Sequence, residues 1–348
     1  MKKRIKILIF AVLLSLTLTL VSSCGKKDKT TLNVYSWGDY IDESVIETFE
    51  EKYKIKVNYD TFSTNEDMYV KIKSGGGDYD LLFPSDYMIK KMINEGMLQK
   101  IDFNNIPNYK YIEERFKNLD YDPQNEYSVP YMWGTLGILY NKTMVTKPIT
   151  AWRDLWDEDY KKQILMLDSQ RDSIGVALKM LGYSMNSKDT EELEAAKQAL
   201  IKQKPLVLAY VGDDVKDKMI AGEAALAVVW SGDAVYMIRE NPDLNYILPA
   251  EGANLWFDAM VIPSSSKHKT EAEKFINFLC EPEIAFKNTD YIGYSTPHLE
   301  AKKMLDPELL NSIAAYPKEE ELVNSDIFDD LSSVIRVYDR IWTEVKAE

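Results

Sequence analysis

Apolar positions occur in short continuous runs along most of the chain, and segments with helical spacing separate them. The first quarter alternates as strand, helix, strand, helix and strand, over residues 32–37, 43–53, 54–62, 65–75 and 79–85. Apolar strands that alternate with helices are typical of a parallel sheet covered by helices. We therefore expect an α/β fold.

The same theme returns later, in the segments 163–168, 173–184, 190–203, 206–211, 214–240 and 244–263. The chain is expected to end in helical segments at 270–290 and 325–348. About 325 residues follow the N-terminal leader, which is more than one hydrophobic core usually supports. Two lobes are therefore expected.

The leader consists of a basic start, "MKKRIK", and an apolar run of 14 residues at 7–20. That run is shorter than the ~20 residues of a membrane-spanning helix. It leads into "VSSC", where a small residue precedes Cys24 as in bacterial lipoproteins. We expect a lipoprotein signal peptide at 1–23, lipid on the Cys24 thiol and a polar tether at 24–30, since two acyl chains hold a protein firmly to a membrane. The alternative is an ordinary signal peptide with an incidental cysteine.

Charge and cysteine content narrow the function classes further. Cys280 is the only cysteine after Cys24, so no disulfide within the processed chain is expected. The net charge is −14, and removal of the leader's four positive charges takes it to −18. An acidic protein of this kind repels nucleic acid and anionic lipid and raises the local concentration of cationic solutes.

Aromatic and acidic residues gather where the expected strands end. Three of these ends carry a tryptophan within three residues of an aspartate, and the others carry acids or tyrosines at equivalent places. Ligands of α/β sheets bind beyond the carboxyl ends of the strands. Each residue alone has a simpler explanation, because tryptophans often pack at strand ends and aspartates often cap helices. The set is Trp37, Asp39, Tyr40, Ser85, Asp86, Tyr87, Asp168, Asp172, Asp213, Trp230, Asp233, Trp256, Asp258 and Tyr294.

Aromatic faces beside carboxylates suit an organic cation with an apolar stem. Ring faces pack on methylene groups and attract ammonium groups, at roughly 0.5–2 kcal/mol per contact. Carboxylates supply charge-assisted hydrogen bonds to the ends of such a ligand. Sugars also pack on aromatic walls, but their pockets are usually completed by Asn, Gln and Arg.

The sequence gives little support to catalysis or to a metal cofactor. His268 and His298 are the only histidines, and neither has a second histidine or a cysteine at ligand spacing. No G-x-S-x-G motif is present. A pair of carboxylates able to cleave glycosides is available by chance, but nothing marks one of them as the proton donor. We expect no enzyme activity, no metal and no cofactor.

From about Leu32 to Lys346 the chain resembles the spermidine/putrescine-binding proteins of bacterial ABC importers. The stretches that carry the resemblance include "YSWGDYI", "YDLLFPSDYMIKKMINEGMLQKID", "YSVPYMWGTLGILYN", "AWRDLW", "GEAALAVVWSGDA" and "LWFDAMVIP". The resemblance implies a two-lobed periplasmic-binding-protein fold of type II, with sheets rich in parallel strands, flanking helices and a hinge. Lobe one would comprise 31–135 plus 259–306, and lobe two 136–258 plus 307–348. The ligand would lie in the cleft, and hinge bending would close the lobes over it.

The resemblance also assigns binding roles to twelve residues. Trp37, Asp39 and Tyr40 would form one wall of the cleft, and Ser85, Asp86 and Tyr87 a second contact loop. Asp168 and Asp172 would lie near ammonium groups, while Trp230, Trp256 and Tyr294 would enclose the methylene chain. Asp258 would be the central carboxylate that holds an amine. Gly38, Ser169 and Phe328 depart from the family pattern, at positions that help to decide between putrescine and spermidine.

The function implied is a receptor that captures putrescine or spermidine and presents it to membrane permease subunits. It would be a monomer that performs no chemistry and binds no nucleic acid. A lipid anchor would hold it outside the cytoplasmic membrane, in the periplasm or at the cell surface. Two alternatives remain open: a receptor for a quaternary amine, a sugar or ferric ion on the same scaffold, and a polyamine sensor.

Overall fold

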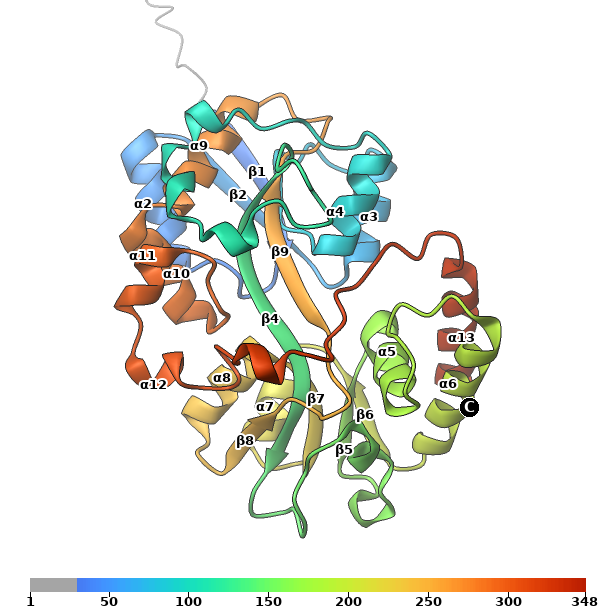
Figure 1. The fold of residues 1–348 in the computed structure, drawn as a ribbon. Coiled ribbons are helices and arrows are strands. Elements are labelled where there is room, and N and C mark those ends of the chain that lie inside the picture. The colour runs from blue at the N-terminus through green and yellow to red at the C-terminus, as the bar shows by residue number, and fades with distance from the viewer. Residues whose placement is uncertain (1–29) are drawn as a thin grey trace, which may run out of the picture.

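The computed structural model describes residues 30–348 (Figure 1). The predicted signal peptide, Cys24 and residues 24–29 of the predicted tether lie outside the described residues. Within 30–348, every helix is too short or too polar to cross a membrane.

The described residues form one mixed sheet of nine strands, in the order β2-β1-β3-β9-β4-β7-β5-β6, with β8 paired to β4. The strands are β1 (Thr31–Trp37), β2 (Lys56–Phe62), β3 (Leu81–Leu82), β4 (Ser128–Asn141), β5 (Ile164–Leu167), β6 (Val207–Val211), β7 (Leu226–Trp230), β8 (Leu244–Ile247) and β9 (Leu255–Val261).

Helices flank the sheet on both sides (Figure 1). The α-helices are α2 (Glu43–Tyr53), α3 (Asn65–Lys73), α4 (Asp86–Asn94), α5 (Gln170–Met180), α6 (Thr190–Gln203), α7 (Val215–Ile220), α8 (Ser231–Glu240), α9 (Lys269–Leu279), α10 (Pro282–Ile292), α11 (Leu299–Met304), α12 (Pro307–Leu310) and α13 (Ile335–Ala347). Short 3-10 helices lie at Phe103–Asn105, Pro107–Tyr111, Glu114–Phe116, Trp152–Trp156, Glu158–Tyr160 and Glu319–Glu321.

The long strand β4 divides the sheet into two sections. Its residues 128–135 pair with β9, whereas its residues 136–141 pair with β7 and β8. We call β1, β2, β3, β9 and the first part of β4 section one, and the remaining strands section two. Figure 1 shows β4 and β9 running through the middle of the molecule from one section toward the other. Residues 255–258, placed in lobe two by the resemblance, pair with β4 in section one. The residue bounds of the two lobes stay a prediction.

Parallel pairs occur in both sections, as the alternation of strands and helices predicts. β1 pairs with β2 and β3, and β5 pairs with β6 and β7, all in parallel. The strands between these groups are antiparallel, because β3 pairs with β9, and β4 pairs with β7, β8 and β9, in that sense. The sheet is therefore mixed, and the continuous strand β4, whose two parts belong to different sections, joins them.

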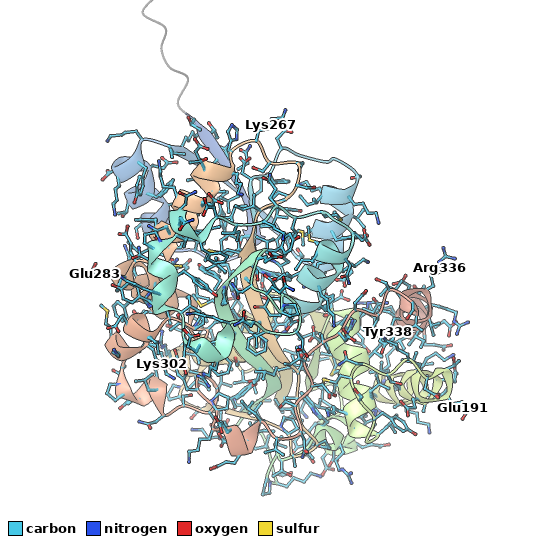
Figure 2. All side chains as sticks on the ribbon, turned by 45° about the horizontal axis from the view of Figure 1, so that its top comes forward. Glu191, Lys267, Glu283, Lys302, Arg336 and Tyr338 are labelled. Carbon is cyan, nitrogen blue, oxygen red and sulfur yellow. The ribbon has the colours of Figure 1, made fainter. Side chains whose placement is uncertain are left out.

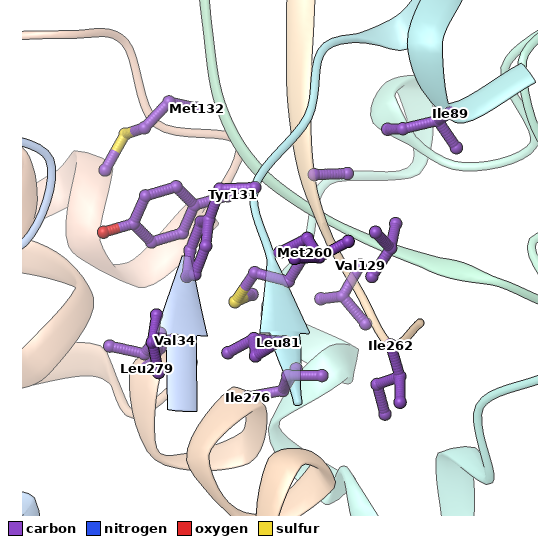
Figure 3. Close-up of a cluster of buried hydrophobic side chains, with 14 of the residues drawn as sticks. Val34, Leu81, Ile89, Val129, Tyr131, Met132, Met260, Ile262, Ile276 and Leu279 are labelled. Carbon is purple, nitrogen blue, oxygen red and sulfur yellow. The ribbon is translucent and has the colours of Figure 1, made fainter. Parts of the chain in front are cut away.

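Both sections have their own apolar cores. In section one, Val34 of β1, Leu81 of β3, Val129 of β4 and Met260 of β9 meet under helix α9 (Figure 3). In section two, separate clusters cover the sheet, and a further cluster joins α5, α6 and α13. Figure 2 shows the charged side chains of Glu191, Lys267, Glu283 and Arg336 at the outline of the molecule. Burial of this apolar area holds the strand ends in place.

One helix and one strand are shorter than the sequence pattern predicts. Helix α13 begins only at Ile335, so residues 325–334 of the expected C-terminal helix are not helical. The backbone of Asp326 bonds instead to Ala253 and Leu255, and its carboxylate accepts from Met185 N and pairs with Lys179. These long-range bonds replace the helical ones. The expected strand 79–85 is reduced to the two residues of β3.

Candidate ligand-binding cleft

A cleft of about 960 Å³ lies between the two sections of the sheet and receives residues from both. Section one contributes the turns after β1 and β2 and the start of α4, and section two contributes the starts of α5, α7 and α8. All twelve residues that the resemblance assigned to binding line this cleft: Trp37, Asp39, Tyr40, Ser85, Asp86, Tyr87, Asp168, Asp172, Trp230, Trp256, Asp258 and Tyr294. Their role in binding stays a prediction.

Asp258, in the middle of β9, is a buried carboxylate with one oxygen left open. Its side chain is 5% exposed, and Tyr40 Oη donates to Asp258 Oδ2 at 2.7 Å. Asp258 Oδ1 is buried and has no hydrogen-bond partner among residues 30–348. Burial raises the pKa of Asp258 to about 6, although Ser85 and Tyr40 act in the opposite direction. The open oxygen can accept a donor from a ligand.

Asp172, in the first turn of α5, is the second carboxylate of this kind. It is 6% exposed, and Ser169 Oγ lies 2.6 Å from Asp172 Oδ2. The other oxygen, Asp172 Oδ1, is buried without a partner in the described part of the chain. Burial raises the pKa of Asp172 to about 6, against the lowering effects of Ser169 and Arg171. The positive end of the helix dipole favours an acid here, but it gives Oδ1 no donor.

Asp86 has a structural function within the same wall. Its Oδ1 accepts from Tyr87 N at 2.6 Å, and its Oδ2 accepts from Phe257 N at 3.0 Å. The carboxylate therefore ties the start of α4 to β9 beside Asp258. Burial raises the pKa of Asp86 to about 8, although both backbone bonds lower it. Asp86 is the first residue of α4 rather than its N-cap, so its bonds fix β9 to the helix start instead of capping the helix.

Trp256 and Tyr294 form an aromatic corner next to Asp258. Their rings meet edge to face at 5.0 Å, and Trp256 Nε1 is buried without a partner in the described residues. A Cβ at Gly134, opposite Trp256 in the sheet, would lie 2.5 Å from that indole. A Cβ at Gly232 would lie 2.0 Å from the Tyr294 ring. Two glycines thus make room for both rings.

The remaining aromatic residues are fixed from several directions. Trp37 Nε1 donates to the Phe83 carbonyl at 2.8 Å, and its ring lies 4.5 Å from Phe62. The Tyr40 backbone carbonyl accepts from Tyr131 Oη at 2.7 Å. Trp230, at the end of β7, packs against the cores of both sections. These rings are held in place without a ligand, which lowers the entropy cost of binding.

The opposite part of the cleft, around Asp39 and Asp233, already contains a cation. Lys216 Nζ lies 3.2 Å from Asp39 Oδ2 and 3.9 Å from Asp233 Oδ1. A Cβ at Gly38 would lie 3.4 Å from Asp213 Oδ2, so the turn after β1 approaches the loop before α7. Burial raises the pKa of Asp233 to about 6, and Lys216 acts against this rise. Sections one and two therefore meet here through an ion pair.

At the other end, Tyr87, Arg171 and Phe328 form a stack. The Arg171 guanidinium lies 4.3 Å from the Phe328 ring centre and 5.0 Å from that of Tyr87. Tyr87 Oη donates to Glu66 Oε1 at 2.9 Å. Asp168 is half exposed and pairs with Lys346 of α13 at 2.8 Å. Asp168 thus lies at a cleft edge with its charge already balanced.

Five charged residues of the cleft were not singled out from the sequence: Glu66, Arg171, Asp214, Lys216 and Asp217. Glu66 comes four residues after the end of β2. The expectation that ligands bind beyond the carboxyl ends of strands therefore includes it once that strand is considered. Arg171 and Lys216 are cations, and a sequence pattern of acidic and aromatic residues does not include them. The side chains of the described residues contain no group of three or more His, Cys, Asp or Glu placed to hold a metal ion.

Comparison with known proteins decides the family. Residues 44–318 match the family described as bacterial extracellular solute-binding protein. The chain is 37% identical to the spermidine/putrescine-binding periplasmic protein of Salmonella typhimurium, over 94% of each chain. The chain belongs to this family of extracellular solute-binding proteins. Membership assigns it to a class of transport receptors.

Solved structures of family members share its fold. A protein described as a spermidine/putrescine ABC transporter from Listeria monocytogenes is 44% identical, with a TM-score of 0.89 over 91% of this chain and 99% of that one. The TpPotD lipoprotein of Treponema pallidum is 29% identical, with a TM-score of 0.83 over 91% of this chain and 100% of that one. The predicted fold class, a two-lobed periplasmic-binding-protein fold of type II, is confirmed, as is the resemblance to spermidine/putrescine-binding proteins.

Proposed function

We propose that this protein binds a polyamine, putrescine or spermidine, in the cleft and delivers it to an ABC importer. The observation that carries the proposal is the pair of buried carboxylates, Asp258 and Asp172, each with an oxygen that no other described residue satisfies. A buried carboxylate without a partner costs free energy, and an ammonium group from a ligand removes that cost. Two such acids in one cleft call for two ammonium groups.

The aromatic walls supply the rest of the recognition. Trp37, Trp230, Trp256 and Tyr294 pack on the methylene groups between the ammonium groups, and ring faces attract cations. Tyr40 and Ser85 orient the Asp258 carboxylate, and Asp86 fixes the backbone beside it. Asp39 and Asp168, whose charges are partly balanced by lysines, act at the edges of the cleft. The name of the Salmonella typhimurium relative supports this ligand class.

Transport requires closure and release rather than catalysis. Binding joins residues of both sections, so the ligand favours a closed arrangement of two lobes that meet near residue 135 of β4. The closed form is then recognised by permease subunits driven by a cytoplasmic ATPase. The protein itself performs no chemistry and acts as a monomer.

We also propose that the protein is anchored outside the cytoplasmic membrane by lipid on Cys24. The apolar run at 7–20 followed by "VSSC" supports this, and the Treponema pallidum relative is described as a lipoprotein. Mass spectrometry of the membrane fraction tests it. A diacylated peptide beginning at Cys24 is expected, and an unmodified Cys24 would contradict the proposal.

Isothermal titration of the full chain, purified in mild detergent, tests the ligand class. Bound polyamine is first removed by denaturation, dialysis and refolding. Putrescine, spermidine, glycine betaine and maltose are then titrated in turn. A polyamine is expected to bind one to one, with an affinity that falls as salt is added. Heat from betaine or maltose alone would show that the fold is correct and the ligand class is wrong.

A further inference from the structure

The side chain of Lys216 places a cation of the protein itself inside the cleft. Its ammonium lies between Asp39, after β1, and Asp233, in the first turn of α8. Lys216 itself is only 18% exposed, whereas its nearer partner Asp39 is 69% exposed. The charge of Asp213 acts on it as well. Three carboxylates from two sections of the sheet therefore surround one internal ammonium group.

Within residues 30–348, no lysine or arginine forms an ion pair with either carboxylate at the centre of the cleft, although the charge of Arg171 lowers the pKa of Asp172. Asp258 accepts only from neutral groups, and Asp172 has a serine as its bonded partner. Both have a buried oxygen that is open among the described residues. Tyr294 connects the two regions, because burial and the charges of Asp233 and Asp258 all raise its pKa well above the usual value. The Lys216 cluster is thus a neighbour of the open carboxylates within one cleft.

The far end of the cleft is also filled from within. Arg171 is buried, stacks on Phe328 and Tyr87, and donates to the Asp329 carbonyl at 3.0 Å and to Asn186 Oδ1 at 3.2 Å. These bonds hold the guanidinium in place. A ligand ammonium cannot stack where this guanidinium already lies. Internal cations at both ends leave the central carboxylates for the ligand.

We propose that Lys216 is a specificity-determining residue whose ammonium occupies a third cation position, so that the cleft favours a diamine over a triamine. The inference rests on the proposed function and deepens it, because it selects among polyamines. The third ammonium of a triamine would have to displace Lys216 or lie beside it, and like charges at that distance repel. A diamine meets Asp258 and Asp172 and leaves the Lys216 cluster intact.

The test compares titrations of putrescine and spermidine into the full chain and into Lys216→Met, which keeps most of the side chain's length and removes its charge. Lys218→Met is the matched control. Lys218 lies on the same helix and pairs with Asp214 at 3.6 Å and Glu223 at 3.8 Å, but it does not line the cleft. Thermal unfolding of each variant checks that it is folded. If Lys216→Met does not fold, Lys216→Gln carries the test.

The wild type is expected to bind putrescine more tightly than spermidine. In Lys216→Met the ratio of spermidine to putrescine affinity is expected to rise at least about tenfold, because a close pair of like charges is removed and three carboxylates become available. Lys218→Met should leave the ratio unchanged. Lys216→Arg, which keeps the cation, should retain the wild-type preference.

Two results would overturn the inference. A wild-type preference for spermidine would show that Lys216 does not exclude a third ammonium group. Equal weakening of both ligands in Lys216→Met would show that Lys216 only ties the two sections together. Failure of the proposed function looks different, because neither polyamine would then bind the wild type.

Discussion

Aspartate side chains have different partners in two regions of the cleft. We call the region of Asp258 and Asp172 the centre, and the region of Asp39, Lys216 and Asp233 the mouth. At the centre, Asp258 and Asp172 are almost fully buried and each keeps an open oxygen. At the mouth, Asp39 is 69% exposed and shares Lys216 with Asp233. The pKa of Asp233 is raised to about 6, as are those of the two central acids, so the partners rather than the pKa values separate the two regions.

This difference indicates which carboxylates can gain free energy from a bound ammonium group. An exposed carboxylate that already has a cationic partner, as Asp39 has, contributes little to binding, because water and salt screen it. A buried carboxylate without a cation is unfavourable in the free protein, and an ammonium group of the ligand reverses that. The carboxylates at the centre therefore have oxygens open to a ligand cation, whereas those at the mouth are already paired with Lys216 in the free protein.

The largest expected effect follows Asp258→Asn. The amide removes the charge and keeps the shape, so polyamine affinity should fall roughly hundredfold or more, as for other desolvated charge pairs. Asp39→Asn is the matched control and should change affinity less than about threefold, because the Asp39 carboxylate is 69% exposed and already paired with Lys216. Titration calorimetry measures both. Equal losses in the two variants would remove the distinction between centre and mouth.

A drop in pH should act on the centre next most strongly. The ligand binds the ionised carboxylates, and burial raises their free-state pKa to about 6. Affinity should therefore be constant above about pH 7 and fall as the pH drops through 6, by roughly tenfold for each of the two groups at pH 5. Titrations between pH 5 and 8 give this profile. A flat profile would mean that Asp258 and Asp172 carry full charge throughout.

A smaller effect is expected for Gly134→Ala, which moves the aromatic wall rather than a charge. The added Cβ meets Trp256 at 2.5 Å and Ser231 Oγ at 2.6 Å, so the indole must shift. Affinity should fall about tenfold, together with a loss of about 1–3 kcal/mol in unfolding free energy from overpacking. Gly212→Ala also lies on the cleft but has open space for its Cβ, and it should be neutral. Unchanged binding by Gly134→Ala would show that Trp256 does not contact the ligand.

Much of the central region was predictable from local pattern. Trp37 and Trp230 end β1 and β7, where residues beyond strand ends were expected to line a cleft, whereas Trp256 and Asp258 lie within β9 and reach the cleft from inside that strand. For Trp37 and Trp230 the expectation holds because hydrophobic burial fixes the strands, and their ends then lie at the cleft. The sequence pattern did not distinguish a structural aspartate from one with an oxygen free for a ligand. Asp86 and Asp258 both lie beside aromatic residues in the sequence, but both oxygens of Asp86 accept from backbone N–H groups.

The mouth was not predictable in the same way. Lys216 lies in "DDVKDK", which has the composition of an exposed helix, and its partner Asp39 is 177 residues away. Residues 325–334 have a helical pattern, but Asp326 instead bonds to distant backbone groups. Both outcomes depend on tertiary contacts that override local propensity.

The central claim is that open, buried carboxylates receive the ammonium groups of the ligand. Counting protons tests it most directly, by titrating putrescine at pH 6 in two buffers with different heats of ionisation. Because the free carboxyl groups are partly protonated at that pH and ionised in the complex, the account predicts that binding releases protons at pH 6 and almost none at pH 8. Binding at pH 6 without any proton release would contradict it.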